Sequence, residues 1–156
     1  MKIIDAKPEQ ADELTKIATA AKSFWGYPKH WTELWHDELT VTDSYIRKNN
    51  VRIAVRDGEL VGFYALEDKG EWWDLGHMWV WPGAIRSGVG RVLFQDAIGQ
   101  VKRSGKKGII ILSDPKAEGF YKKMGAEQVG EYVTWLEGKR RALPILKIVV
   151  KDNQDE

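Results

Sequence analysis

The spacing of hydrophobic residues predicts a helix over residues 89–101. Apolar side chains recur there at helical intervals and fall on one side: Val89, Val92, Leu93, Ala97, Ile98 and Val101. Residues 75–81 just before are mostly apolar or aromatic, and Pro82 and Gly83 end the run, which predicts a strand. A strand, a short loop with two glycines and an amphipathic helix therefore follow one another across residues 74–101.

Patterning predicts further elements on both sides of this segment. Two apolar runs, residues 51–55 and 60–66, flank Asp57 and Gly58, a pair typical of a tight hairpin turn. A helix is predicted over residues 8–22, with its apolar face at Leu14, Ile17, Ala18 and Ala21. The other predictions are strands at 2–5, 71–81, 109–112, 127–136 and 143–150, and helices at 42–49, at 117–124 and after Pro28, the last carrying Trp31, Leu34, Trp35 and Leu39.

The order of these elements predicts how the strands pair. Three strands in a row, followed by a helix and another strand, fit an antiparallel half joined to a parallel crossover. Residues 109–112 form a continuous apolar run, as expected for a buried central strand. Between the last two strands, residues 137–141 predict a basic loop, either a solvated turn or a contact for an anion.

Composition narrows the class of protein. The 156 residues predict one domain over 1–156, and a formal net charge of +1 argues against an electrostatic nucleic-acid binder. No cysteine is present, which excludes disulfides and thiolate metal sites, and no metal spacing is convincing among the other residues. The N-terminus does not resemble a signal peptide, and no apolar run is long enough to span a membrane, so we expect a cytoplasmic protein. The polar residues 151–156 predict a disordered tail.

The loop before the predicted helix is a candidate anion site. Gly88 and Gly90 allow a ligand to approach the backbone, and the first amides of a helix have no partner inside it. Arg86 and Arg91 add positive charge. A Walker A loop is excluded because Val89 stands at the lysine position, and a complete dinucleotide fingerprint is excluded because Leu93 replaces the third glycine. A helix start that merely tolerates glycine is the structural alternative.

Four ordered motifs give the chain a resemblance to the GNAT superfamily of N-acetyltransferases. They are Val80-Trp81-Pro82 at the end of a strand, Gly88-Val89-Gly90, the strand at 109–112, and Ala117-Glu118-Gly119-Phe120-Tyr121-Lys122-Lys123-Met124-Gly125. The resemblance implies an α/β (α+β) fold, with a mixed, mostly antiparallel sheet of six to seven strands and helices on both faces. One departure is that Ile85 stands where the family usually has Arg or Gln, with Arg86 one step later.

The resemblance implies an enzyme that transfers the acetyl group of acetyl-CoA to a primary amine by direct attack in a ternary complex. A non-catalytic acetyl-CoA-binding sensor or interaction module is the alternative, and a binding protein without a coenzyme A site is a third. The backbone near residues 78–80 is expected to pair with the pantetheine arm, and one amide there to face the thioester oxygen. The residues expected to contact the cofactor are Met78, Trp79, Val80, Arg86, Ser87, Gly88, Val89, Gly90, Arg91, Asp114 and Tyr121.

Three residues are candidates for proton transfer. Tyr121 matches the family tyrosine that protonates the departing thiolate, and a phenol of pKa near 10 is able to do so. Asp74 and His77 are candidate bases for the acceptor amine, although their odd separation places them on opposite sides of a regular strand. The structural alternatives are an edge charge for Asp74 and a packed histidine at residue 77. For Asp114, capping the next helix is favoured over a catalytic role.

Eight tryptophans among 156 residues are unusual, and three of them fall between residues 25 and 35. In GNAT enzymes this region lies over the acceptor. Trp25, Tyr27 and Trp31 are therefore expected to contact a small, partly apolar or cationic amine. Core packing is the alternative for Trp31 and Trp35, because aromatics at helical spacing usually pack. The resemblance also allows a homodimer.

Overall fold

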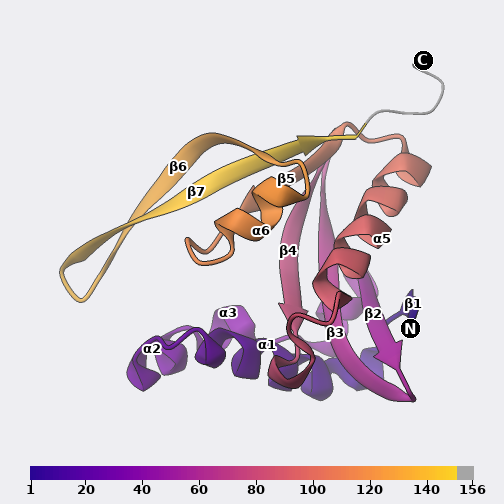
Figure 1. Cartoon of the computed structure of the whole chain (residues 1–156), viewed down its shortest axis with the longest axis horizontal. Helices are drawn as coiled ribbons and strands as arrows, with labels where there is room; N and C mark the ends of the chain where they lie inside the picture. Colours follow the sequence, from indigo (N-terminus) through magenta and orange to yellow (C-terminus); the bar gives the residue numbers. More distant parts are fainter. Residues whose placement is uncertain (151–156) are drawn as a thin grey trace. The chain divides into compact units, whose positions relative to one another are not determined.

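The computed structural model describes residues 1–150 as a mixed α/β fold (Figure 1). A mostly antiparallel sheet of seven strands has the order β1-β2-β3-β4-β5-β7-β6 and is flanked by helices. The strands are β1 Lys2–Asp5, β2 Asn50–Arg56, β3 Glu59–Lys69, β4 Trp72–Val80, β5 Gly108–Leu112, β6 Glu127–Leu136 and β7 Lys139–Val149. The helices are η1 Pro8–Gln10, α1 Ala11–Phe24, α2 Lys29–Leu34, α3 His36–Leu39, α4 Asp43–Lys48, η2 Pro82–Ala84, α5 Val89–Ser104 and α6 Glu118–Lys123.

The chain divides into two compact units. One comprises Met1–Glu67 and Gly76–Ala97, and the other comprises Asp68–Leu75 with the described chain from Ile98 onward. The expectation of one domain over the whole chain stays a prediction. The expected disordered tail at residues 151–156 lies outside the described residues. No helix in residues 1–150 is both long and apolar enough to cross a bilayer.

In the first unit, helix α1 buries the face that its spacing predicts. Leu14, Ile17, Ala18 and Ala21 are each at most 5% exposed, and the first three join one hydrophobic cluster with residues of α4, β2 and β3. Burying a leucine or isoleucine side chain contributes about 1.5–3 kcal/mol. The predicted N-cap of α4 is confirmed, because the Thr42 hydroxyl accepts a hydrogen bond from the Tyr45 amide at 3.0 Å.

The β2–β3 hairpin turns at the predicted Asp-Gly pair. Asp57 has φ 53° and Gly58 has φ 79°, which is the backbone required by the two-residue turn that fits the strand twist. Farther along β3, Gly62 lies beneath neighbouring elements of the same unit. A Cβ atom there would lie 2.8 Å from the carbonyl oxygen of Trp79 and within 3.2 Å of Val89 and Leu93 side chains. A glycine at this position therefore lets β3 approach β4 and the start of α5 closely.

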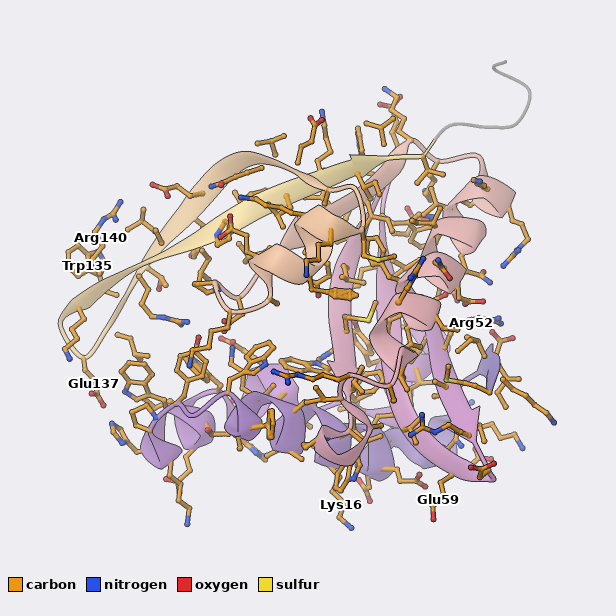
Figure 2. The ribbon with its side chains drawn as sticks, viewed as in Figure 1. Lys16, Arg52, Glu59, Trp135, Glu137 and Arg140 are labelled. Atoms are coloured by element: carbon orange, nitrogen blue, oxygen red, sulfur yellow. The ribbon has the colours of Figure 1, made fainter. Side chains whose placement is uncertain are left out.

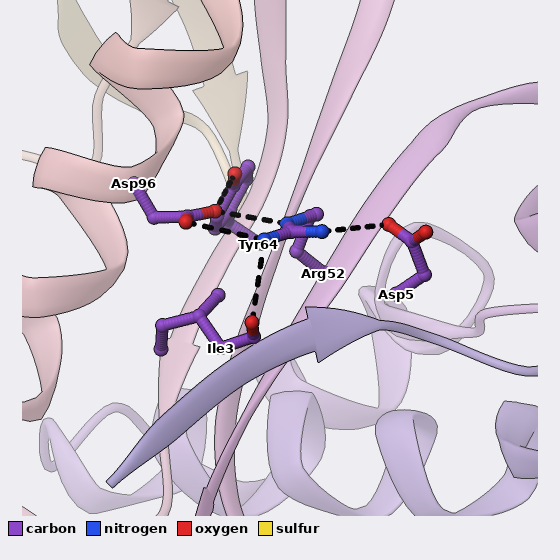
Figure 3. Close-up of polar contacts among 5 residues, drawn as sticks. All are labelled: Ile3, Asp5, Arg52, Tyr64 and Asp96. Atoms are coloured by element: carbon purple, nitrogen blue, oxygen red, sulfur yellow. Dashed lines mark hydrogen bonds and ion pairs between the residues drawn. The ribbon is translucent and has the colours of Figure 1, made fainter.

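A polar network centred on Arg52 holds β2 within the first unit (Figure 3). Its guanidinium group donates to Asp96 at 2.9 and 3.2 Å, to Asp5 at 2.9 Å and to the carbonyl of Ile3 at 3.3 Å. Asp96 also accepts a 2.5 Å hydrogen bond from the buried Tyr64 hydroxyl. The hydrogen bond to Asp96 raises the pKa of Arg52, and burial raises the pKa of Tyr64. Both groups therefore keep their protons and donate to one carboxylate.

In the second unit, strand β5 is a central strand as predicted. It pairs in parallel with β4, where Trp73 lies opposite Ile109 and Asp74 opposite Ile110, and it pairs antiparallel with β7. The parallel β4–β5 pair confirms the predicted crossover. A long β6–β7 hairpin follows, and Trp135, Glu137 and Arg140 lie at its tip (Figure 2).

The prediction of a basic loop at residues 137–141 is wrong. The turn consists of Glu137 and Gly138 alone, both with positive φ, and β7 begins at Lys139. Arg140 pairs with Glu131 at 3.6 Å, and Arg141 approaches Asp114 at 3.7 Å. Strand pairing continues to the tip because the Glu-Gly turn fits a hairpin, a signal that the run of basic residues obscured.

The helix predicted after Pro28 is broken. It divides at Trp35 into α2 and α3, and Leu34, predicted to be on the apolar face, is 62% exposed. Leu39, predicted on the same face, is buried, and so is Thr32. The apolar residues thus keep their three-to-four spacing across the break at Trp35, where the sequence has neither glycine nor proline to indicate it.

Candidate active site

The loop before α5 is a turn with two residues of positive φ. Arg86 has φ 67° and Gly88 has φ 86°, and Ile85 before them is extended. The Gly88 carbonyl accepts from the Val92 amide at 3.1 Å, so helix α5 begins directly after it. The amides of Val89, Gly90 and Arg91 in this first turn have no acceptor within the helix, and the helix dipole adds partial positive charge there.

The side chains of this loop leave its backbone open. Nothing lies within 4 Å of a Cβ atom built on Gly88, and Arg86, Ser87 and Gly88 are exposed. The Ser87 hydroxyl donates to the Ala84 carbonyl and accepts from Arg56 at 3.0 Å. Ser87 therefore fixes the turn, and its neighbours Arg86 and Gly88 are exposed.

Strand β4 carries candidate residues in both units. Met78, Trp79 and Val80 are half-buried in the first unit, and the Trp81 amide after them donates to the Val61 carbonyl of β3 at 2.8 Å. Asp74 lies in the second unit, where it is half-buried opposite Ile110. The β4 backbone is thus held on the β3 side near residue 81 and on the β5 side near residue 74.

His77 is buried among aromatic rings. It is 8% exposed, with the rings of Tyr45 at 5.5 Å and Phe63 at 5.7 Å. Its Nδ1 accepts a hydrogen bond from the Trp79 indole at 3.0 Å, so the proton of the neutral ring is on Nε2. Burial lowers the pKa of His77 to about 4, against an opposing effect of Glu67. The ring is therefore neutral at pH 7, and its lone pair is already engaged.

Glu67 is a polar residue of this cluster that the sequence did not indicate. The Tyr45 hydroxyl donates to it at 2.6 Å, and burial together with this bond raises the pKa of Tyr45. A Cβ atom on Gly76 would collide with both the Glu67 carboxylate and the Tyr45 hydroxyl. The only sequence signal is a glycine inside an aromatic strand, which often marks the close approach of another group.

Tyr121 lies on α6 in the second unit and is 7% exposed. Burial, and to a lesser extent the charge of Asp114, raises the pKa of its hydroxyl. The adjacent Phe120 ring is 5.3 Å away. Tyr121 is therefore protonated at neutral pH, which is the state needed to give a proton to a thiolate.

Asp114 is a structural acceptor in the loop after β5. Its side chain, 7% exposed, accepts from the Lys116 amide at 2.8 Å and lies 3.7 Å from the Arg141 guanidinium. The expected capping of the next helix is wrong, since α6 begins at Glu118 with Ala117 as its N-cap. The carboxylate instead orders the loop that leads to α6.

The N-terminal aromatic residues gather around a lysine. The ammonium of Lys22 lies 5.3 Å from the ring of Trp25, 5.2 Å from that of Tyr27 and 4.4 Å from that of Trp35. Such contacts contribute about 0.5–1 kcal/mol when exposed and about 2 kcal/mol when desolvated. The Trp25 ring also packs against Trp79 of β4 at 5.7 Å. Trp31 lies 5.8 Å from Tyr27 and 6.0 Å from Trp35.

The first unit thus brings together the turn before α5, the later half of β4 with His77, and the aromatic residues. The second unit holds Asp74, Asp114 and Tyr121. Within residues 1–150, no group of three His, Asp or Glu residues has an arrangement suited to a metal ion.

Residues 6–134 match the family profile of the acetyltransferase (GNAT) domain. The chain belongs to the GNAT acetyltransferase family.

Solved structures of GNAT proteins share this fold. A GCN5-related N-acetyltransferase from Rhodopseudomonas palustris is 19% identical, with a TM-score of 0.76 over 95% of this chain and 94% of that one. The PaiA N-acetyltransferase from Thermoplasma acidophilum, solved with coenzyme A, is 17% identical, with a TM-score of 0.73 over 94% and 96%. A ribosomal-protein-alanine N-acetyltransferase from Brucella melitensis is 17% identical, with a TM-score of 0.71 over 96% and 99%. No curated protein sequence matches this chain significantly.

Membership of the GNAT family confirms the sequence-based assignment and the predicted fold class. The match covers the aromatic region, β4, the turn before α5 and α6, so each candidate residue lies within it. The roles of the individual residues stay predictions.

Proposed function

We propose that this GNAT protein transfers the acetyl group of acetyl-CoA to the primary amine of a small molecule. The observation that carries the proposal is the exposed turn at residues 86–88, which opens directly into the first amides of α5. Such a helix start binds phosphate groups, and coenzyme A carries a pyrophosphate. The coenzyme A bound to the Thermoplasma relative supports the same ligand class.

The backbone around this turn is assigned to the cofactor. The amides of Gly88, Val89, Gly90 and Arg91 receive the pyrophosphate, and Arg86 adds charge from an exposed position. Ser87 serves this site by fixing the turn. The main chain of Met78, Trp79 and Val80 pairs with the pantetheine arm, and one of its amides stabilises the oxyanion of the thioester.

Tyr121 is assigned as the acid that protonates the thiolate of coenzyme A. Support comes from its buried, protonated hydroxyl and from its place in the motif at residues 117–125. The neutral amine attacks the thioester carbonyl, the C–S bond breaks, and Tyr121 gives its proton to the departing sulfur. The proton that the new amide nitrogen loses restores the Tyr121 hydroxyl. Asp114 is assigned a supporting role, because its carboxylate orders the loop before α6.

Asp74 is assigned as the base, acting on the acceptor ammonium through water. His77 is the weaker base, since its lone pair accepts from Trp79 and its pKa is about 4. We assign His77 to positioning Trp79, whose ring packs against Trp25. The exposed and half-buried aromatic rings near residues 25–35 support a small-molecule acceptor, although the Brucella relative is named for a protein acceptor.

Release of the coenzyme A thiol in the presence of acetyl-CoA and a panel of primary amines tests the proposal. The expected result is thiol release that requires an amine and yields the acetylated amine by mass spectrometry. Binding of acetyl-CoA without release for any amine or N-terminal peptide would contradict catalysis and favour the sensor. Release with peptides alone would contradict the small-molecule acceptor.

A further inference from the structure

Three aromatic rings surround the ammonium group of Lys22. The ring centroids of Trp25, Tyr27 and Trp35 lie 4.4–5.3 Å from the lysine nitrogen, and all three residues belong to one short segment of the chain. Aromatic faces attract a cation through their quadrupole, and such cages recognise organic ammonium groups. We call Lys22, Trp25, Tyr27 and Trp35 the ammonium cage.

The cage walls are held in place by contacts beyond the lysine. Tyr27 packs edge-on against Trp35 at 5.2 Å, and Trp31 supports both rings. Trp35 also packs against the hydrophobic cluster of the first unit. The rings are therefore held by one another as well as by Lys22, so a ligand ammonium that displaces the lysine meets preformed walls.

One wall connects the cage to strand β4. Trp25 packs on Trp79, whose indole nitrogen donates to His77. All of these residues belong to the first unit, so the contact lies within one compact body. The cage therefore adjoins the strand whose backbone the proposed function assigns to the thioester.

We infer that the ammonium cage binds a cationic group of the acceptor. Without the acceptor, the Lys22 ammonium occupies the place of that group. The reacting amine must be neutral when it attacks, whereas the cage stabilises a charged group. The caged cation is therefore the second, non-reacting ammonium of the acceptor. This inference rests on the proposed function and narrows its substrate class to diamines and related amines that carry another positive charge.

Equilibrium binding of 1,4-diaminobutane, followed by tryptophan fluorescence without acetyl-CoA, tests the inference. Wild type is compared with Lys22→Met and Lys22→Gln, which remove the cation but keep a long side chain, so the test does not depend on one variant folding. Lys29→Met, an exposed charge at the start of α2, is the matched control. The neutral 1,4-butanediol is the matched ligand.

The expected result is at least tenfold tighter diamine binding in both Lys22 variants, wild-type affinity in the Lys29 variant and no binding of the diol. Adding Tyr27→Leu to a Lys22 variant should reverse the gain. Unchanged diamine affinity in the Lys22 variants, equal binding of the diol, or a gain that survives Tyr27→Leu would overturn the inference. Because no acetyl-CoA is present, failure here is distinct from failure of the enzyme to bind its cofactor or to turn over.

Discussion

Gly62 and Gly88 lie in two parts of the first unit and serve different physical needs. Gly62 provides room, because a side chain there would meet the carbonyl of Trp79 at 2.8 Å and two side chains of α5. Gly88 provides conformation, because its φ is 86° and nothing lies within 4 Å of a Cβ atom. At Gly62 the constraint is the packing of neighbouring atoms, and at Gly88 it is the backbone conformation. A side chain as small as alanine should therefore disturb the structure around Gly62, whereas the turn at Gly88 should be disturbed mainly by a bulky side chain.

The largest effect is expected where buried side chains share a partner. Asp96→Ala leaves the Arg52 guanidinium and the buried Tyr64 hydroxyl without their common acceptor, which should lower the free energy of unfolding by about 3 kcal/mol. Asp5→Ala removes another partner of Arg52, one whose side chain is 83% exposed, and should lower the free energy of unfolding by less than about 1 kcal/mol. Urea unfolding of both variants measures the difference. Equal losses of unfolding free energy in the two variants would contradict the expectation that the buried partner matters more than the exposed one.

The next effect is a loss of stability on acidification. His77 has a folded pKa of about 4, below the ordinary value of 6.5, so the unfolded chain takes up the proton first as pH falls. The free energy of unfolding should therefore keep its full value above pH 6.5 and fall as the pH drops towards 4, by up to about 3 kcal/mol. His77→Asn, which keeps an acceptor for Trp79, should reduce this decline in urea unfolding at pH 7 and 4.5. The exposed His36→Gln serves as control, and an identical decline in His77→Asn and wild type would exclude His77 as the cause.

The two glycines themselves provide a smaller test. Gly62→Ala should lower the free energy of unfolding by about 2 kcal/mol, because a backbone carbonyl must move. Gly88→Ala should cost about 1 kcal/mol, because only the positive φ is penalised. Gly119→Ala in α6, where a Cβ atom has open space, should be neutral or stabilising. A larger loss for Gly88→Ala than for Gly62→Ala in thermal or urea unfolding would reverse the comparison.

Tyr121 extends the comparison to the second unit. Tyr121→Phe keeps the buried ring and removes the proton, so kcat should fall at least tenfold, about 1.4 kcal/mol, with little change in acetyl-CoA affinity. Exposed Tyr132→Phe on β6 is the control. Steady-state kinetics with saturating amine measure kcat for both variants. A wild-type kcat in Tyr121→Phe would contradict the assignment of Tyr121 as the acid.

The sequence predicted the parts of the fold that local spacing controls. The hairpin at Asp57-Gly58, the buried face of α1 and the start of α5 each depend on residues within one turn or one helix. Gly88 was also a usable sequence signal, because it adopts a positive φ in the turn before α5. The parallel β4–β5 pair followed from element order and the handed crossover.

Contacts between distant side chains were not predictable in this way. Tyr45 and Glu67 are 22 residues apart, and no local pattern indicates that one donates to the other. The break at Trp35 and the short turn at Glu137 were missed because periodicity and charge continue through both. The lysine among the aromatic rings depends on the bend after α1, which spacing alone does not specify.

The central claim is that the turn at residues 86–88 receives the pyrophosphate of coenzyme A. Isothermal titration with acetyl-CoA, coenzyme A and ATP should give micromolar binding of the two coenzyme A species by the wild type. Gly88→Trp should abolish it, whereas Gly58→Trp, at a glycine with the same sign of φ and equally open space, should retain it. Equal affinity in Gly88→Trp and Gly58→Trp, or no binding by the folded wild type, would contradict the claim.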